Sequence, residues 1–146
     1  MSAYSNILVA IDLGETSGDL ISKALSIAGQ PSAVHVAYVH QRMESLYMGS
    51  GPIGSEAAAV SGFDDRLQAD LKQRLLDWAA STEIPAEQVH FLGGKPSRVL
   101  REFAQENNVD LIVIGSRSQK GLQRLLGSTA NAVVQKAACD VLAVRG

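Results

Sequence analysis

The stretch Val109–Thr129, VDLIVIGSRSQKGLQRLLGST, contains the pattern that decides the fold. Residues 109–114 are almost all apolar and predict a buried strand. A glycine-punctuated loop follows, and a helix is predicted to begin at Ser128 and Thr129. The N-terminus of a helix presents N–H groups and a positive dipole end, which favour an anion such as phosphate. The stretch therefore predicts a sheet strand followed by a candidate phosphate site.

The loop itself leaves two interpretations open. Neither G-x-x-x-x-G-K-[ST] nor G-x-G-x-x-G, the two stricter phosphate-binding patterns, occurs within the stretch 109–129. Glycine-rich turns also occur where a chain only has to reverse tightly. On the loop alone, a phosphate site and a plain turn are both admissible.

Length and charge bound the possible functions. The 146 residues fit one domain, 1–146, which is long enough to bury about two-thirds of its unfolded surface. The 13 Lys and Arg are scattered among 15 Asp and Glu, for a net charge of −2, which argues against a general nucleic-acid binder. The start, MSAYSNILVAID, does not resemble a signal peptide, and no apolar run has the length of a membrane span. With a single cysteine, Cys139, an internal disulfide is impossible, and we expect a cytoplasmic protein.

Strands and helices are predicted to alternate along the chain. Continuous apolar runs predict strands, and apolar spacings of three and four predict helices. The strands are expected at 5–13, 33–40, 88–92, 109–114 and 140–145, and the helices at 15–28, 63–81, from 96 to the Asn107–Asn108 pair, and 128–137. A glycine-rich segment, 41–62, is predicted to be a flexible flap with a short helix around 55–60.

This alternation predicts an α/β fold, a single-domain five-stranded parallel sheet with helices on both faces. Ligands of such sheets bind beyond the carboxyl ends of the strands, where the winding direction reverses. The usual strand order, 3-2-1-4-5, would make Asp12 at the end of the first strand a neighbour of Gly115 at the end of the fourth.

The chain resembles the universal stress protein family over nearly its whole length. The residues that carry the resemblance are NILVAID, AYVH, GKPSRVL, DLIVIGSR followed by GLQRLLGST, and CDVLAVR. The resemblance implies a Rossmann-like domain of the adenine nucleotide alpha hydrolase type. It also implies a cytoplasmic homodimer paired through the final strand, 140–145. One subgroup of the family binds ATP and another does not.

The ATP-binding subgroup is similar to G-x-x-G, nine residues, then G-[S/T]. Gly115 matches the first glycine, and Gly127 with Ser128 matches the closing pair. Ser118 replaces the middle glycine, and only the eight residues 119–126 separate it from Gly127. The loop is therefore one residue shorter than the subgroup's pattern.

The resemblance also implies a set of site residues. Ala10, Ile11 and Asp12 would line the adenosine, and the backbone of Val39 would meet the adenine edge. The ribose and phosphates of ATP, with a divalent cation such as Mg²⁺, would lie on the following residues: Gly115, Ser116, Arg117, Ser118, Gly127, Ser128 and Thr129.

Simpler roles exist for several of these residues. Asp12 could cap the helix that follows, and Gly127–Ser128 could be a turn and an N-cap. Arg117, Lys120 and Arg124 could be a solvated face.

Catalytic and metal-binding motifs are not visible in the sequence. His35 and His40 are five positions apart on one strand and so lie on opposite faces, which excludes a shared metal. His90 has no ligand partner close in sequence, and Cys139 is expected to be a small packing residue.

The leading hypothesis is a stress-response protein in which ATP acts as a regulatory switch, with at most slow ATPase activity. The alternative is a nucleotide-free dimeric adaptor that recruits protein partners through the 41–62 segment or the last strand. A dedicated ATPase or nucleotidyl-transferring enzyme is a third, weaker hypothesis.

Overall fold

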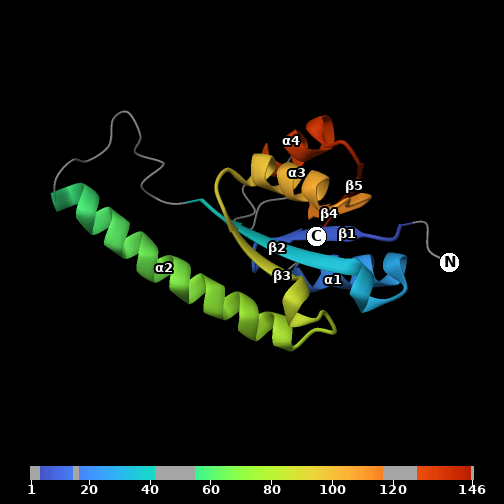
Figure 1. The fold of residues 1–146 in the computed structure, drawn as a ribbon, viewed down its shortest axis with the longest axis horizontal. Coiled ribbons are helices and arrows are strands. Elements are labelled where there is room, and N and C mark those ends of the chain that lie inside the picture. Colours follow the sequence, from blue (N-terminus) through green and yellow to red (C-terminus); the bar gives the residue numbers. More distant parts are fainter. Residues whose placement is uncertain (1–3, 15–16, 42–54, 117–127, 146) are drawn as a thin grey trace.

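The computed structural model describes residues 4–14, 17–41, 55–116 and 128–145. Five parallel strands form one sheet in the order β3-β2-β1-β4-β5 (Figure 1), which confirms the predicted fold class. The strands are β1 (Ile7–Ile11), β2 (Val34–His40), β3 (Val89–Gly93), β4 (Leu111–Gly115) and β5 (Asp140–Val144). The helices are α1 (Ser17–Ala28), α2 (Ser55–Ala80), α3 (Pro96–Glu106) and α4 (Ser128–Lys136), with short 3-10 turns η1 (Pro31–Ala33) and η3 (Ala86–Gln88).

β1 is the central strand of the sheet, and every one of its five residues is buried. Ile7 lies opposite Val34 of β2 on one side and Leu111 of β4 on the other. A strand that is flanked on both edges and covered on both faces needs an unbroken apolar sequence, and ILVAI supplies it.

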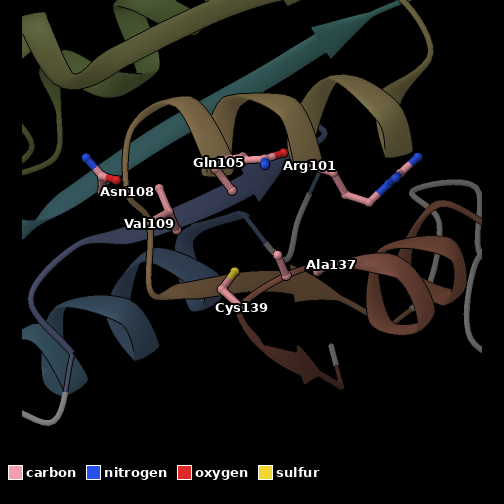
Figure 2. Close-up of a pocket in the computed structure, with 8 residues that line it drawn as sticks. Arg101, Gln105, Asn108, Val109, Ala137 and Cys139 are labelled. Atoms are coloured by element: carbon pink, nitrogen blue, oxygen red, sulfur yellow. The ribbon is translucent and has the colours of Figure 1, made fainter.

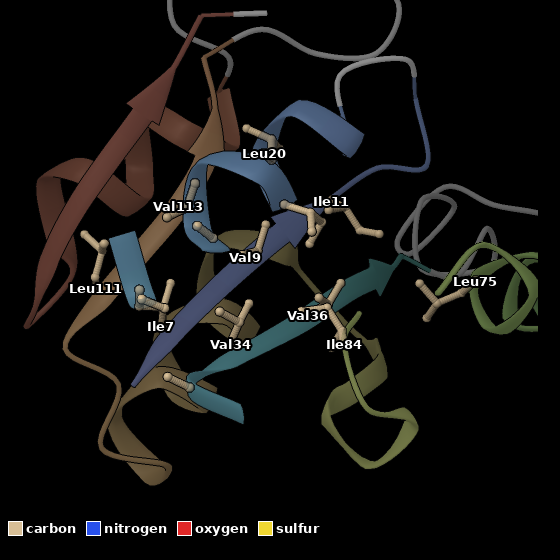
Figure 3. Close-up of a cluster of buried hydrophobic side chains, with 14 residues drawn as sticks. Ile7, Val9, Ile11, Leu20, Val34, Val36, Leu75, Ile84, Leu111 and Val113 are labelled. Carbon is tan, nitrogen blue, oxygen red and sulfur yellow. The ribbon is translucent and has the colours of Figure 1, made fainter. Parts of the chain in front are cut away.

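Two hydrophobic layers hold the helices to the sheet. Odd-numbered residues of β1 pack with α1, α2 and the segment after α2, as the side chains in Figure 3 show; examples are Val9, Leu20 and Leu75. Even-numbered residues of β1 pack with α3 and α4 on the opposite face, where Leu8 joins Leu100 and Val133. The period of two along each strand therefore assigns every core side chain to one of the two layers.

The helix ends follow the predicted signals. Gly29 ends α1 in a left-handed conformation, with φ of 81°, and its N–H donates to the carbonyl of Leu25. Pro96 begins α3 at its favoured position, and Asn108 follows the end of α3 with φ of 55°. These two positive φ values confirm that the glycine and the asparagine pair were correctly interpreted as stop signals.

The short helix expected around 55–60 is present, but it is the start of α2 and not a separate element, so the flap prediction is wrong for 55–62. Helix α2 begins at Ser55 and runs without a break for 26 residues, so residues 55–62 are helical. A run of alanines has the highest intrinsic helix propensity, and one glycine in a long helix costs only about 1 kcal/mol. The remainder of the predicted flap, 42–54, lies outside the described residues.

Candidate functional site

The carboxyl ends of β1 and β4 lie side by side, at the end of the sheet where all five parallel strands finish; this end is called the carboxyl edge below. Ala10 is opposite Ile114, so the next step along each strand places Ile11 beside Gly115. Asp12 follows directly after β1. The predicted proximity of Asp12 and Gly115 is therefore confirmed, and it lies where β1 separates β2 from β4, the reversal point of the winding.

Ala10 and Ile11 reach this edge with their backbones only. The side chain of Ala10 belongs to the layer under α3 and α4, and that of Ile11 belongs to the layer under α1 and α2. Both are buried. Any contact that these two residues make with a ligand must therefore use their peptide groups.

The carboxylate of Asp12 stabilises the turn that leaves β1. Its Oδ1 accepts a hydrogen bond of 2.8 Å from the N–H of Gly14. Between them, Leu13 has φ of 62°, a conformation that costs a non-glycine residue about 1–2 kcal/mol. The packing of the Leu13 side chain on the α1 layer and the bond from Gly14 offset this strain. Asp12 therefore stabilises the turn through Oδ1, and its other carboxylate oxygen, Oδ2, is the one that could accept a hydrogen bond from a ligand.

The backbone of Val39 faces toward β1. Because the carbonyl of His40 accepts from the N–H of Gly94, the peptide groups of His40 point to the β3 side. Successive residues of a strand direct these groups to alternate sides, so those of Val39 point to the β1 side. The register between β1 and β2 ends at Ile11 and Tyr38, one position before Val39. The structure thus places the backbone of Val39 next to the turn at Asp12.

Gly115 and Ser116 are half-buried at the end of β4. The N–H of Ser116 donates to the carbonyl of Val144 at 2.9 Å, so this donor is used by the pairing of β4 with β5. Ser116 can therefore contribute to an anion site through its hydroxyl, whereas its N–H is committed to the sheet.

Ser128 and Thr129 form the first turn of α4, as predicted. Ser128 is exposed and Thr129 is half-buried, so the N-terminus of this nine-residue helix carries two hydroxyl side chains. Arg117, Ser118 and Gly127, the other predicted phosphate contacts, lie outside the described residues.

Sequence reasoning missed Tyr38, which lies beside the same edge. Its ring stacks on Phe91 of β3 with centroids 5.5 Å apart. Burial raises the pKa of the Tyr38 phenol, Arg74 of α2 lowers it and the charge of Asp12 raises it further. A residue of α2 and the turn after β1 therefore share one electrostatic environment around Tyr38. The sequence did contain a signal for Tyr38, because an aromatic residue directly precedes Val39, the predicted adenine contact.

The cavity in Figure 2 lies elsewhere. It has a volume of about 190 Å³ and is lined by the last turns of α3, including Arg101 and Gln105, and by Ala137 and Cys139 just before β5. These segments adjoin the amino ends of β4 and β5. The cavity thus lies at the amino ends of the strands, whereas Asp12 and Gly115 lie at the carboxyl ends.

The histidines differ from the prediction in one respect. His35 and His40 do lie on opposite faces, but His90 is a direct neighbour of His35, with Nδ1 of His35 3.1 Å from Nε2 of His90. Their separation of 55 positions in sequence concealed this contact. Within the described ranges, no group of three or more His, Cys, Asp or Glu side chains could hold a metal ion. Nor does any described helix have the length and apolarity to cross a bilayer.

The model of the universal stress protein family matches residues 3–145 of the chain. The chain belongs to the universal stress protein family. Universal stress protein A homolog 1 of Coxiella burnetii is 33% identical over 142 residues, covering 97% of this chain and 96% of that protein. Universal stress protein G of Salmonella typhimurium is 30% identical over 146 residues, covering 97% and 99%.

Solved universal stress proteins share the fold. The protein UspA from Lactobacillus plantarum superposes with a TM-score of 0.73 at 23% identity, covering 99% of this chain and 100% of that one. A universal stress protein solved in complex with cAMP superposes with a TM-score of 0.58 at 24% identity, covering 98% of each chain.

Proposed function

We propose that this universal stress protein binds ATP at the carboxyl edge of β1, β2 and β4 and uses the nucleotide as a regulatory switch in the cytoplasm. The observation that carries the proposal is the convergence of Asp12, the Val39 backbone and Gly115 on one edge. A structural relative in complex with cAMP supports the adenine nucleotide class.

The donor set fits the parts of a nucleoside triphosphate. The second carboxylate oxygen of Asp12 can accept a hydrogen bond from a ribose hydroxyl, and the peptide groups of Val39 suit the edge of an adenine ring. The two hydroxyls and the positive end of α4 favour phosphate oxygens, which a helix N-terminus stabilises by about 0.3–2 kcal/mol. A divalent cation such as Mg²⁺ would neutralise the phosphates.

Bound ATP can act as a switch only through a difference in its affinity for two states of the protein. Segments 115–129 and 41–62 are the proposed elements that respond. We expect ATP hydrolysis to be slow at most. Among the described residues, the acidic residue at this edge is Asp12, and in the proposed pose it contacts the nucleoside and not the phosphates, where a general base would be needed.

The first test is to denature purified protein, identify released nucleotide by mass spectrometry and titrate stripped protein with ATP by calorimetry. Asp12→Asn keeps an acceptor for the N–H of Gly14 but removes the charge. We expect it to weaken ATP binding about 10- to 100-fold, since a hydrogen bond to a charged group contributes about 1.5–3 kcal/mol. Ser26→Ala, an exposed serine on α1 that donates to Lys23, is the control and should bind normally.

A second variant addresses the glycine loop. A bulky residue at Gly127 should abolish ATP retention. Full ATP binding by both this variant and Asp12→Asn, or no binding by the stripped wild type, would contradict the proposal.

The alternative, a nucleotide-free dimeric adaptor, is favoured by the position of β5. This strand is at the edge of the sheet, and an edge offers backbone groups to another chain. Val134 of the neighbouring helix α4 is 45% exposed, which adds apolar surface on that side. A two-fold dimer through 140–145 is compatible with either function.

Light scattering at micromolar concentration tests the dimer. Because Val144 points its carbonyl toward β4, the peptide groups of Ala143 point outward. Ala143→Pro removes one outward N–H and should give a folded monomer, whereas Ala143→Thr keeps it and should remain dimeric. A monomeric wild type would refute dimerisation through β5. Retained partner binding without nucleotide would favour the adaptor.

A further inference from the structure

Two histidines from neighbouring strands form a pair on the face of the sheet that α3 covers. Nδ1 of His35 and Nε2 of His90 are 3.1 Å apart, and the rings stack with centroids separated by 5.4 Å at an angle of 26°. An imidazole hydrogen bond needs one nitrogen that carries a proton and one that does not. The contact therefore exists only while at least one of the two rings is neutral.

The ring of Phe103 of α3 packs against both histidine rings. Its ring centroid is 4.7 Å from that of His90 and 6.1 Å from that of His35. Both histidines are half-buried. The pair thus joins three elements, namely β2, the edge strand β3 and α3, at a place where water screens charge only in part.

Among the described residues of β1, β2, β3 and α3, no acidic side chain pairs with either ring. β1 has no ionisable side chain, and His40 of β2 lies on the opposite face, where its ring stacks with Phe91. On α3, Arg98 and Glu102 pair with each other on the exposed face, and Nε of Arg101 donates to the carbonyl of Ser97. Glu106, the remaining ionisable residue of α3, is exposed. Burial lowers the pKa of both histidines, and the charge of His35 lowers that of His90 further.

We propose that the His35–His90 contact is an acid-sensitive latch, which holds the edge strand β3 against β2 at neutral pH and weakens when both imidazoles become protonated. Double protonation removes the hydrogen bond and places two like charges in contact at a half-buried site. The side chain of Gln88 also joins this end of β3 to β2, donating to the carbonyls of Val34 and Pro31, and it does not titrate. The histidine pair is therefore the pH-dependent part of this connection.

The sign of the effect follows from linkage. An unfolded chain binds protons on both histidines near pH 6.5, whereas the native pair, with both pKa values lowered, resists them. Stability from the pair is fully present above pH 6.5 and is lost as the pH falls toward the native values. Each proton that only the unfolded chain binds lowers the folding equilibrium constant about tenfold per pH unit.

The test compares the pH dependence of urea unfolding in wild type and in His35→Asn/His90→Gln. These amides can still hydrogen-bond but do not titrate, and the only histidine left is His40, because the chain has three. Between pH 7 and pH 5 the folding equilibrium constant should fall by a larger factor in the wild type than in the double variant, by up to about tenfold per pH unit for each proton that only the unfolded chain binds. Ser26→Ala, an exposed and non-titrating site on α1, is the control and should keep the wild-type slope. Equal slopes in wild type and double variant would overturn the proposal.

A second measurement does not depend on the variants folding. An NMR titration of the histidine ring protons in the wild type should give two pKa values below 6.5 for His35 and His90, split from each other by their mutual repulsion. Two independent titrations at or above 6.5 would overturn the latch.

Discussion

Substitution of Gly94 by alanine tests the geometry of the loop that connects β3 to α3. Gly94 has φ of +128°, and its N–H donates to the carbonyl of His40 at 3.1 Å. A Cβ added there would lie 2.8 Å from Cγ2 of Val99 and 3.3 Å from Nη2 of Arg98. The arginine can move, but Val99 is anchored in the first turn of α3 through its N–H to Lys95.

The cost can be divided into two parts. A side chain in this backbone region costs about 1–3 kcal/mol, and the overlap with Val99 costs about 1–3 kcal/mol more. We therefore expect Gly94→Ala to lower the free energy of unfolding by about 2–6 kcal/mol. At about 3–5 °C per kcal/mol for a chain of this size, the loss in Tm is roughly 6–30 °C.

Two other glycines provide matched controls for the same chemical change. Gly29 also has a positive φ, +81°, but has no atom within 4 Å of the added Cβ, so Gly29→Ala should cost only the strain, about 1–2 kcal/mol. Gly18 lies in α1 with neither strain nor neighbours, and Gly18→Ala should stabilise by about 0.5 kcal/mol. Urea unfolding with linear extrapolation measures all three. A smaller loss for Gly94→Ala than for Gly29→Ala, or a loss for Gly18→Ala, would refute the reasoning.

Three further predictions concern the core, the N-terminal anchor and the thiol. Leu100 of α3 is 2% exposed, and Leu100→Ala should cost about 2–5 kcal/mol, whereas Val134→Ala at 45% exposure should cost less than about 1 kcal/mol; urea denaturation compares the two variants. Burial raises the pKa of Asp110, but hydrogen bonds from Ser5 and Asn6 outweigh it and lower that pKa below 3.8. The stability lost in Asp110→Ala at neutral pH should therefore diminish as an acid titration, followed by circular dichroism, falls below pH 4. Burial raises the pKa of the Cys139 thiol, so its reaction with Ellman's reagent at pH 7 should be slow and should accelerate in urea.

Much of the fold was predictable because local signals were strong. The apolar run of β1, Pro96 at the start of α3 and the stop signals at Gly29 and Asn108 all act over a few residues. A short helix was expected around 55–60, but its continuity with the helix expected at 63–81 was missed because Gly62 lies between them. A long helix tolerates one glycine, and packing of its later turns stabilises the whole helix.

The candidate site was predictable to the level of the strands that build it. Asp12 and Gly115 end strands that the expected order places side by side. The use of one Asp12 oxygen by Gly14, and of the Ser116 N–H by Val144, follows from backbone geometry that no residue pattern records. Tyr38 became part of the same environment only when α2 brought Arg74 near it.

The sequence by itself determined the alternation of strands and helices and the family, because each depends on local periodicity or on contiguous motifs. Only the tertiary structure decided that His35 meets His90 under Phe103. That contact depends on the register between β2 and β3, in which Ala37 is opposite His90. Register arises from the packing of whole layers, so residues 55 positions apart become neighbours without any signal near either of them.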